Sequence, residues 1–65
     1  MILTAMPLKE YHELPFDRCV VKGKIEVKIW GKVVAVLHSK TEASGTMCKS
    51  RKEAQALFSK ILQQH

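Results

Sequence analysis

The sequence predicts a small α+β domain in which a three-stranded antiparallel sheet packs against one C-terminal helix. Residues 24–29 alternate strictly between charged and β-branched side chains. A Gly-Lys pair separates them from a second β-branched run at 33–37, and residues 50–62 carry an apolar stripe with helical spacing. With 65 residues in total, we expect residues 1–65 to form a single domain.

Residues 1–18 form an N-terminal lead that fits either a short additional strand or a short additional helix. Met1–Leu3 suits an edge strand, whereas residues 7–13 suit one or two helical turns, because proline is favoured at the first position of a helix. Pro15 should end that helix, since the residue before a proline is pushed out of the helical region.

The sheet is expected within residues 19–48. Cys19–Val21 is a candidate for a further short strand, turned back by Lys22-Gly23. Gly31-Lys32 has the form of a two-residue hairpin turn of type II′. That turn sets the register of the hairpin as Trp30 opposite Val33, Ile29 opposite Val34, Val27 opposite Val36 and Ile25 opposite His38. A third strand is expected around Thr46–Cys48, after a polar loop through Ser39–Gly45.

The helix is expected over residues 50–64, beginning near Arg51. Ser50-Arg51-Lys52-Glu53 is a capping box, in which the Ser50 hydroxyl accepts a hydrogen bond from the Glu53 amide and the Glu53 carboxylate reaches back to Ser50. The apolar stripe that follows has the spacing of a helix packed on a sheet, and its members are Ala54, Leu57, Phe58, Ile61 and Leu62. We expect the stripe to lie in the core. The opposite side of the helix should be exposed to solvent, and its residues are Gln55, Ser59, Lys60 and Gln63.

Pleating gives the predicted hairpin two faces of different chemistry. One face is wholly apolar, so the helix should cover it, and it holds Ile25, Val27, Ile29, Val34 and Val36. The other face mixes charged and apolar side chains, namely Lys24, Glu26, Lys28, Trp30, Val33, Ala35 and Leu37. A contiguous apolar patch on a small protein usually marks a contact surface.

Two kinds of partner suit this mixed face. Lysines around a tryptophan suit nucleic acid, because ammonium groups neutralise phosphates while an indole stacks on a base. The nucleic-acid contacts would then be Lys24, Lys28, Trp30 and Lys32. Alternatively, the face is buried beneath the N-terminal lead, a second copy or another protein, and the interface residues would be Trp30, Val33, Ala35 and Leu37. If a second copy or another protein covers the face, the chain is a homodimer, or an accessory or inhibitor protein of phage or plasmid type.

The net charge of +5 comes entirely from the later part of the chain. Residues 22–65 carry nine Lys and Arg against three Glu, whereas residues 1–21 carry two against three acidic residues. Lys49, Arg51 and Lys52 gather at the start of the helix, where positive charge opposes the helix dipole. Either they bind phosphate together with the helix start, or they are ordinary surface residues that Glu53 offsets.

No catalytic residue, metal site or cofactor is predicted, and we expect no enzymatic activity. The chain offers no suitably placed carboxylate pair and no glycine-rich phosphate loop. His12, Cys19, His38 and Cys48 are zinc-ligand types, but no two of them have the close spacing that prepares a site, which only the fold could assemble. Cys48 precedes the helix beside Lys49, a setting that lowers a thiol pKa, yet a nucleophile would still need a nearby base.

Composition and termini favour a cytoplasmic protein without membrane association. No apolar run approaches the ~20 residues that span a bilayer. The N-terminus has no basic flank and reaches Pro7 too soon for a signal peptide. Two cysteines without an export signal are expected to stay reduced rather than form a disulfide.

Residues 24–62 resemble the arm-type DNA-binding domain at the N-terminus of phage and transposon integrases. The similarity lies in the Gly31-Lys32 hairpin and in the helix start Lys49-Ser50-Arg51-Lys52-Glu53-Ala54. That family has a three-stranded sheet and one helix, as does the plant ethylene-response-factor domain, and its sheet face enters the major groove. The resemblance therefore implies DNA contacts from Lys24, Lys28, Trp30 and Lys32. The chain departs from the family pattern at Val33, Ala35 and Leu37, where polar or basic residues are usual.

The helix start is also similar to that of the last helix in the double-stranded-RNA-binding domain, which grips phosphates. Ser50-Arg51-Lys52-Glu53-Ala54 carries this similarity, although Gln55 stands where a further lysine belongs and Leu57-Phe58 replaces a small alanine pair. Taken together, these features predict a small non-enzymatic nucleic-acid-binding protein, with DNA favoured over RNA.

Overall fold

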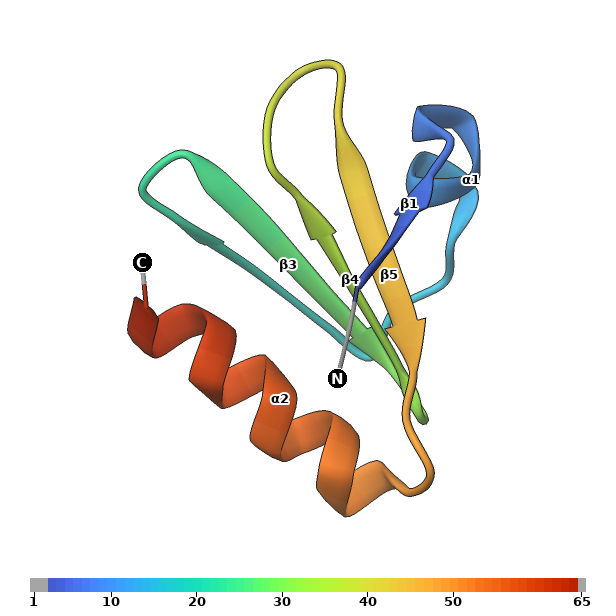
Figure 1. The fold of residues 1–65 in the computed structure, drawn as a ribbon, viewed down its shortest axis with the longest axis vertical. Coiled ribbons are helices and arrows are strands. Elements are labelled where there is room, and N and C mark those ends of the chain that lie inside the picture. Colours follow the sequence, from blue (N-terminus) through green and yellow to red (C-terminus); the bar gives the residue numbers. More distant parts are fainter. Residues whose placement is uncertain (1–2, 65) are drawn as a thin grey trace.

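A computed structural model describes residues 3–64 and has an antiparallel sheet with a C-terminal helix, as predicted, but five strands rather than three (Figure 1). The elements in chain order are β1 (Thr4–Met6), α1 (Leu8–Glu13), β2 (Arg18–Lys22), β3 (Ile25–Trp30), β4 (Val33–Leu37), β5 (Ala43–Met47) and α2 (Arg51–Gln64). The strands lie side by side in the order β1-β5-β4-β3-β2.

The two additional strands come from the segments with the weakest pattern. β2 is the candidate strand at Cys19–Val21, extended by one residue at each end. β1 begins at Thr4, so the predicted strand Met1–Leu3 is wrong at Leu3, and Met1 and Ile2 lie outside the described residues. Both strands are sheet edges, where a side chain has few neighbours and charged residues are favoured. Neither therefore shows the apolar alternation that identifies a half-buried strand.

The central hairpin follows the predicted register. Trp30 lies opposite Val33, Ile29 opposite Val34 and Val27 opposite Val36, and the ladder ends at Glu26 opposite Leu37, before the predicted pair of Ile25 and His38. Gly31 has a φ of +57° while Lys32 has a negative φ, which is the pattern of a type II′ turn. β5 spans Ala43–Met47, so it begins three residues before the predicted strand Thr46–Cys48 and ends before Cys48. The preceding loop is shorter than predicted, because it closes with a hydrogen bond from His38 N to Glu42 O at 2.9 Å.

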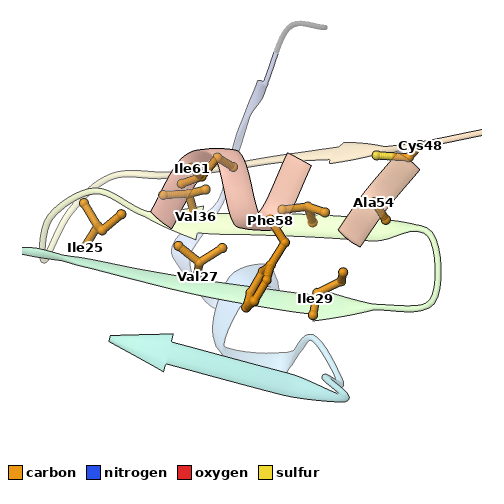
Figure 2. Close-up of a cluster of buried hydrophobic side chains, with 9 residues drawn as sticks. Ile25, Val27, Ile29, Val36, Cys48, Ala54, Phe58 and Ile61 are labelled. Atoms are coloured by element: carbon orange, nitrogen blue, oxygen red, sulfur yellow. The ribbon is translucent and has the colours of Figure 1, made fainter. Parts of the chain in front are cut away.

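Helix α2 covers one face of the sheet, which we call the α2 face. It starts where the capping box predicts, and the Glu53 amide donates to Ser50 Oγ at 3.2 Å. Figure 2 shows the ring of Phe58 pointing from α2 toward β3, between Val27 and Ile29. The buried core on this side is formed by Ile25, Val27, Ile29, Val34, Val36, Cys48, Ala54, Phe58 and Ile61. All of these except Cys48 were predicted to be core, whereas Leu57 and Leu62 of the predicted stripe are only partly buried against it.

Helix α1 covers the opposite face, which we call the α1 face (Figure 1). The chain leaves β1 at one edge of the sheet, crosses this face through α1 and enters β2 at the other edge. Tyr11 is fully buried there and packs with Ala35 and Ala43. The N-terminal lead therefore supplies both a strand and a helix. Much of the mixed face of the hairpin, whose partner the sequence did not decide, is covered by the chain itself.

Candidate functional site

One row of side chains on the α1 face lies beyond the cover of α1. Trp30, Val33 and Met47 are neighbours across β3, β4 and β5, since Val33 lies opposite both of the others. Trp30 is 47% exposed, Met47 is 75% exposed and Val33 is partly buried. We call these three residues the Trp30 strip. Exposed apolar side chains of this size, gathered in one row, mark a contact surface.

A shallow cavity of about 370 Å³ joins the Trp30 strip to two cationic side chains, Lys32 and Arg51. Lys32 stands in the β3–β4 turn and Arg51 is the first residue of α2. A backbone hydrogen bond from Cys48 N to Lys32 O at 2.7 Å holds the segment before α2 against this turn. Lys49, in this segment, and Lys52, in the first turn of α2, are both exposed. The fold thus brings the predicted Trp30 region and the predicted basic helix start to one end of the sheet.

Asp17 braces the turn at the centre of this surface. Its backbone amide donates to Ile29 O at 2.8 Å, and its carboxylate Oδ2 accepts a hydrogen bond from Gly31 N at 3.1 Å. Gly31 requires a positive φ that other residues rarely adopt. The turn carrying Lys32 is therefore held on both sides, and Asp17 also places one negative charge on the cavity wall.

Lys28 is not on this surface, so the expectation that it contacts nucleic acid is wrong for this fold. Its side chain is only 6% exposed. The ammonium donates to Tyr11 O at 3.2 Å and lies 4.4 Å from the centroid of the Tyr11 ring and 5.1 Å from that of Phe16. Lys28 is a buried cation that ties α1 to the sheet, through a charged hydrogen bond and two aromatic faces.

Three other predicted contact residues also lie away from the surface around Trp30. Lys24 is exposed in the Gly23-Lys24 turn at the opposite end of β3, about 20 Å from Trp30 for a six-residue strand. Ala35 is fully buried beneath Tyr11, and Leu37 is partly buried in the same cluster. Of the predicted protein-interface residues, only Trp30 and Val33 remain available.

Sequence reasoning missed Met47 and Asp17 as parts of the site. Met47 lay within the predicted third strand, but its position opposite Val33 depends on a register that no short turn dictates. Asp17 lies in the N-terminal lead, whose path across the sheet has no local signal. Neither residue carried a recognisable motif, so only the tertiary structure reveals their roles.

Three titratable groups in or beside the sheet have raised pKa values. The Tyr11 hydroxyl donates to Glu26 Oε1 at 3.0 Å, and burial together with this carboxylate raises the pKa of Tyr11 far above its usual value. Partial desolvation of the thiol and the Glu26 carboxylate raise the pKa of Cys19, and burial and Glu53 raise that of Cys48. The expectation that the helix start lowers the Cys48 pKa is therefore wrong, because burial disfavours the charged thiolate and the Glu53 carboxylate disfavours it further.

The two cysteines are not joined to each other, since Cys48 lies in the α2-side core and Cys19 is exposed on β2. Within residues 3–64, no three His, Cys, Asp or Glu side chains gather closely enough to hold a metal ion. The same part of the chain contains no helix with the length and apolar character needed to cross a membrane. Comparison with protein-family models, curated proteins and solved structures found no match to this chain.

Proposed function

We propose that this chain is a non-enzymatic nucleic-acid-binding protein that contacts its ligand through the Trp30 strip and the cations around it. One observation carries the proposal: a single cavity is lined by an exposed indole and by both Lys32 and Arg51. Stacking of a base on an aromatic ring contributes about 1–3 kcal/mol per base, and the cations supply the salt-dependent part of binding.

The β3–β4 turn and the start of α2 carry four exposed cations, namely Lys32, Lys49, Arg51 and Lys52. If each neutralises one phosphate, the logarithm of the binding constant should fall with the logarithm of the salt concentration with a slope of about −3 for a single strand. That slope corresponds to a loss of about 50-fold in affinity between 50 and 200 mM salt. A duplex would give a slope of about −4.

The test is fluorescence anisotropy of labelled single-stranded DNA, duplex DNA and RNA with the full chain and matched variants. Lys32→Gln and Arg51→Gln should each weaken binding and reduce the salt slope by about 1. Lys40→Gln is the control, because it removes the same charge from an exposed loop at the other end of β4. Equal effects of Lys40→Gln and Arg51→Gln, or no binding at low salt, would refute the proposal.

A protein contact through the Trp30 strip is the second candidate, favoured by the 75% exposure of Met47 beside Trp30. Sedimentation of the wild type and of Trp30→Ala separates the two functions. A wild-type dimer that becomes a folded monomer in Trp30→Ala assigns the strip to protein. Monomers in both cases, with loss of nucleic-acid binding in the variant, support the nucleic-acid interface.

A further inference from the structure

A second cavity lies on the other side of the Gly31-Lys32 turn, between α2 and the start of β2. It has a volume of about 280 Å³, and its polar lining includes Arg18, Arg51, Gln55 and Ser59. We call it the Arg18 cleft. Arg51, Gly31 and Asp17 line this cleft and also the cavity at the Trp30 strip. The two cavities are therefore neighbours that share one arginine.

The α2 wall of the cleft follows from helical spacing. Arg51, Gln55 and Ser59 are four residues apart, so their side chains follow one another along one flank of α2. The sequence pattern assigned Gln55 and Ser59 to the wet side of the helix, and both are exposed. The fold nevertheless turns this flank toward β2, where Lys22 Nζ donates to the Leu62 carbonyl at the far end of the same side.

Arg18 forms the opposite wall and is held in place by an aromatic ring. It lies opposite Ile29 in the sheet, and its guanidinium carbon is 5.4 Å from the centroid of the Phe58 ring. Phe58 is itself 3% exposed and fixed in the core, so it provides a rigid base for the guanidinium. A cation–π contact of this kind uses the charge of the guanidinium and none of its N–H donors, so these remain for another partner.

The donors in the cleft suit an anion with several oxygen acceptors. Two guanidiniums, one amide and one hydroxyl line it, against a single carboxylate from Asp17. That carboxylate already accepts a hydrogen bond from Gly31 N. The charged lining is positive on balance, and arginine forks match the oxygen geometry of phosphate in particular.

We infer that the Arg18 cleft binds a phosphate group, with Arg18 and Arg51 as the charged donors and Gln55 and Ser59 as neutral ones. The inference rests on the proposed function in one respect: if the chain binds nucleic acid, the phosphate is one of the backbone. A strand whose base contacts Trp30 then passes over the turn, and Arg51 contacts it between the two cavities. A free phosphate ion would use the same donors.

The test combines NMR of the full chain with the anisotropy assay. Inorganic phosphate at low ionic strength should shift the backbone amide signals of Gln55 and Ser59 in a saturable way, and Arg18→Gln should abolish these shifts. Single-stranded oligothymidine should move the same signals, and Arg18→Gln should weaken its binding by about tenfold and reduce the salt slope by about 1. Lys60→Gln is the control, since it removes an equal charge from an exposed position on α2.

Arg18→Lys tests whether Arg18 acts only by stabilising the fold. The lysine keeps the charge and the aliphatic stem over Phe58 but lacks the planar guanidinium. Its circular dichroism spectrum should match the wild type, while its phosphate-induced shifts should be smaller. Gln55 and Ser59 signals that ignore phosphate and oligonucleotide alike would overturn the inference. Equal losses of oligonucleotide affinity in Arg18→Gln and Lys60→Gln would also overturn it, yet leave the proposed function standing.

A further result would refute the proposed function and still support the Arg18 cleft as a phosphate site. If the wild type fails to bind any oligonucleotide but inorganic phosphate still shifts Gln55 and Ser59 through Arg18, the proposed function fails. The cleft is then supported as a phosphate site for a ligand other than nucleic acid.

Discussion

Replacing Lys28 with methionine separates a structural role from a binding role at a residue that the sequence alone assigns to the ligand. The ammonium is buried against Tyr11 O, at 3.2 Å, and between the rings of Tyr11 and Phe16. Methionine has a similar length and fills the same space without a charge. We therefore expect Lys28→Met to loosen the packing of α1 on the sheet without removing any contact to nucleic acid.

The magnitude follows from the contacts that are lost. A hydrogen bond from a charged donor contributes about 1.5–3 kcal/mol, and a partly desolvated cation–π contact about 0.5–2 kcal/mol. Two effects reduce the sum: Tyr11 O keeps a hydrogen bond from Leu14 N at 3.2 Å, and removing a buried charge relieves its desolvation cost. We expect a net decrease of about 1–3 kcal/mol in the free energy of unfolding. In a domain of this size that change lowers the melting temperature by at least about 4 °C.

The assay is urea unfolding followed by circular dichroism, together with the anisotropy titration. Lys24→Met is the matched control, because Lys24 is exposed in a turn. It should change the free energy of unfolding by less than about 0.5 kcal/mol. Both variants should bind oligonucleotide with the wild-type salt slope. A Lys28→Met protein of unchanged stability that binds more weakly would refute the structural role of Lys28.

Three further predictions test the turn, the helix start and the α1 contact. Gly31→Ala should cost roughly 1–2 kcal/mol, measured by thermal unfolding, because alanine disfavours a φ of +57°; an unchanged melting temperature would contradict the assigned turn. Ser50→Ala should cost about 1 kcal/mol by removing the acceptor for the Glu53 amide, whereas Ser50→Asp should restore most of it. The folded state holds the Tyr11 proton more tightly than the unfolded chain does, so this contribution to stability is complete below pH about 10 and is lost as the pH rises above it. Urea unfolding across that range should show a smaller alkaline decline in Tyr11→Phe, and equal declines would argue against the buried hydroxyl.

The central hairpin and α2 could be predicted because each has a local signal. Alternation in residues 25–29 and the Gly31-Lys32 turn define the register without help from the rest of the chain. The cap at Ser50 and the spacing of the stripe define α2 in the same way. α1 has a weaker local signal in Pro7 and Pro15, which predicted a short helix over residues 7–13, whereas β1 and β2 show no apolar alternation. Their short lengths are stabilised by pairing at the sheet edges and by the burial of Tyr11, which are tertiary effects.

Only part of the candidate site could be predicted, because some of its residues have local signals and others are positioned by tertiary contacts. Trp30 was identified from strand alternation, Lys32 from the hairpin turn and Arg51 from the helix start, and the fold brings them to one cavity. Lys28 was assigned wrongly because alternation tells which face a side chain occupies but not what covers that face. Arg18 was missed because its place beside Phe58 depends on β2 joining the sheet. Contacts between residues far apart in the chain cannot be predicted from the local hydrophobic pattern of the sequence.

The central claim is that the exposed Trp30 strip and its cations bind nucleic acid. Trp30 is the only tryptophan in the chain, so its intrinsic fluorescence reports directly on the strip. Titration with single-stranded oligonucleotide should change this emission to saturation, with an affinity about 50-fold lower at 200 than at 50 mM salt. An emission that stays constant at low salt, or a binding constant that does not depend on salt, would contradict the claim.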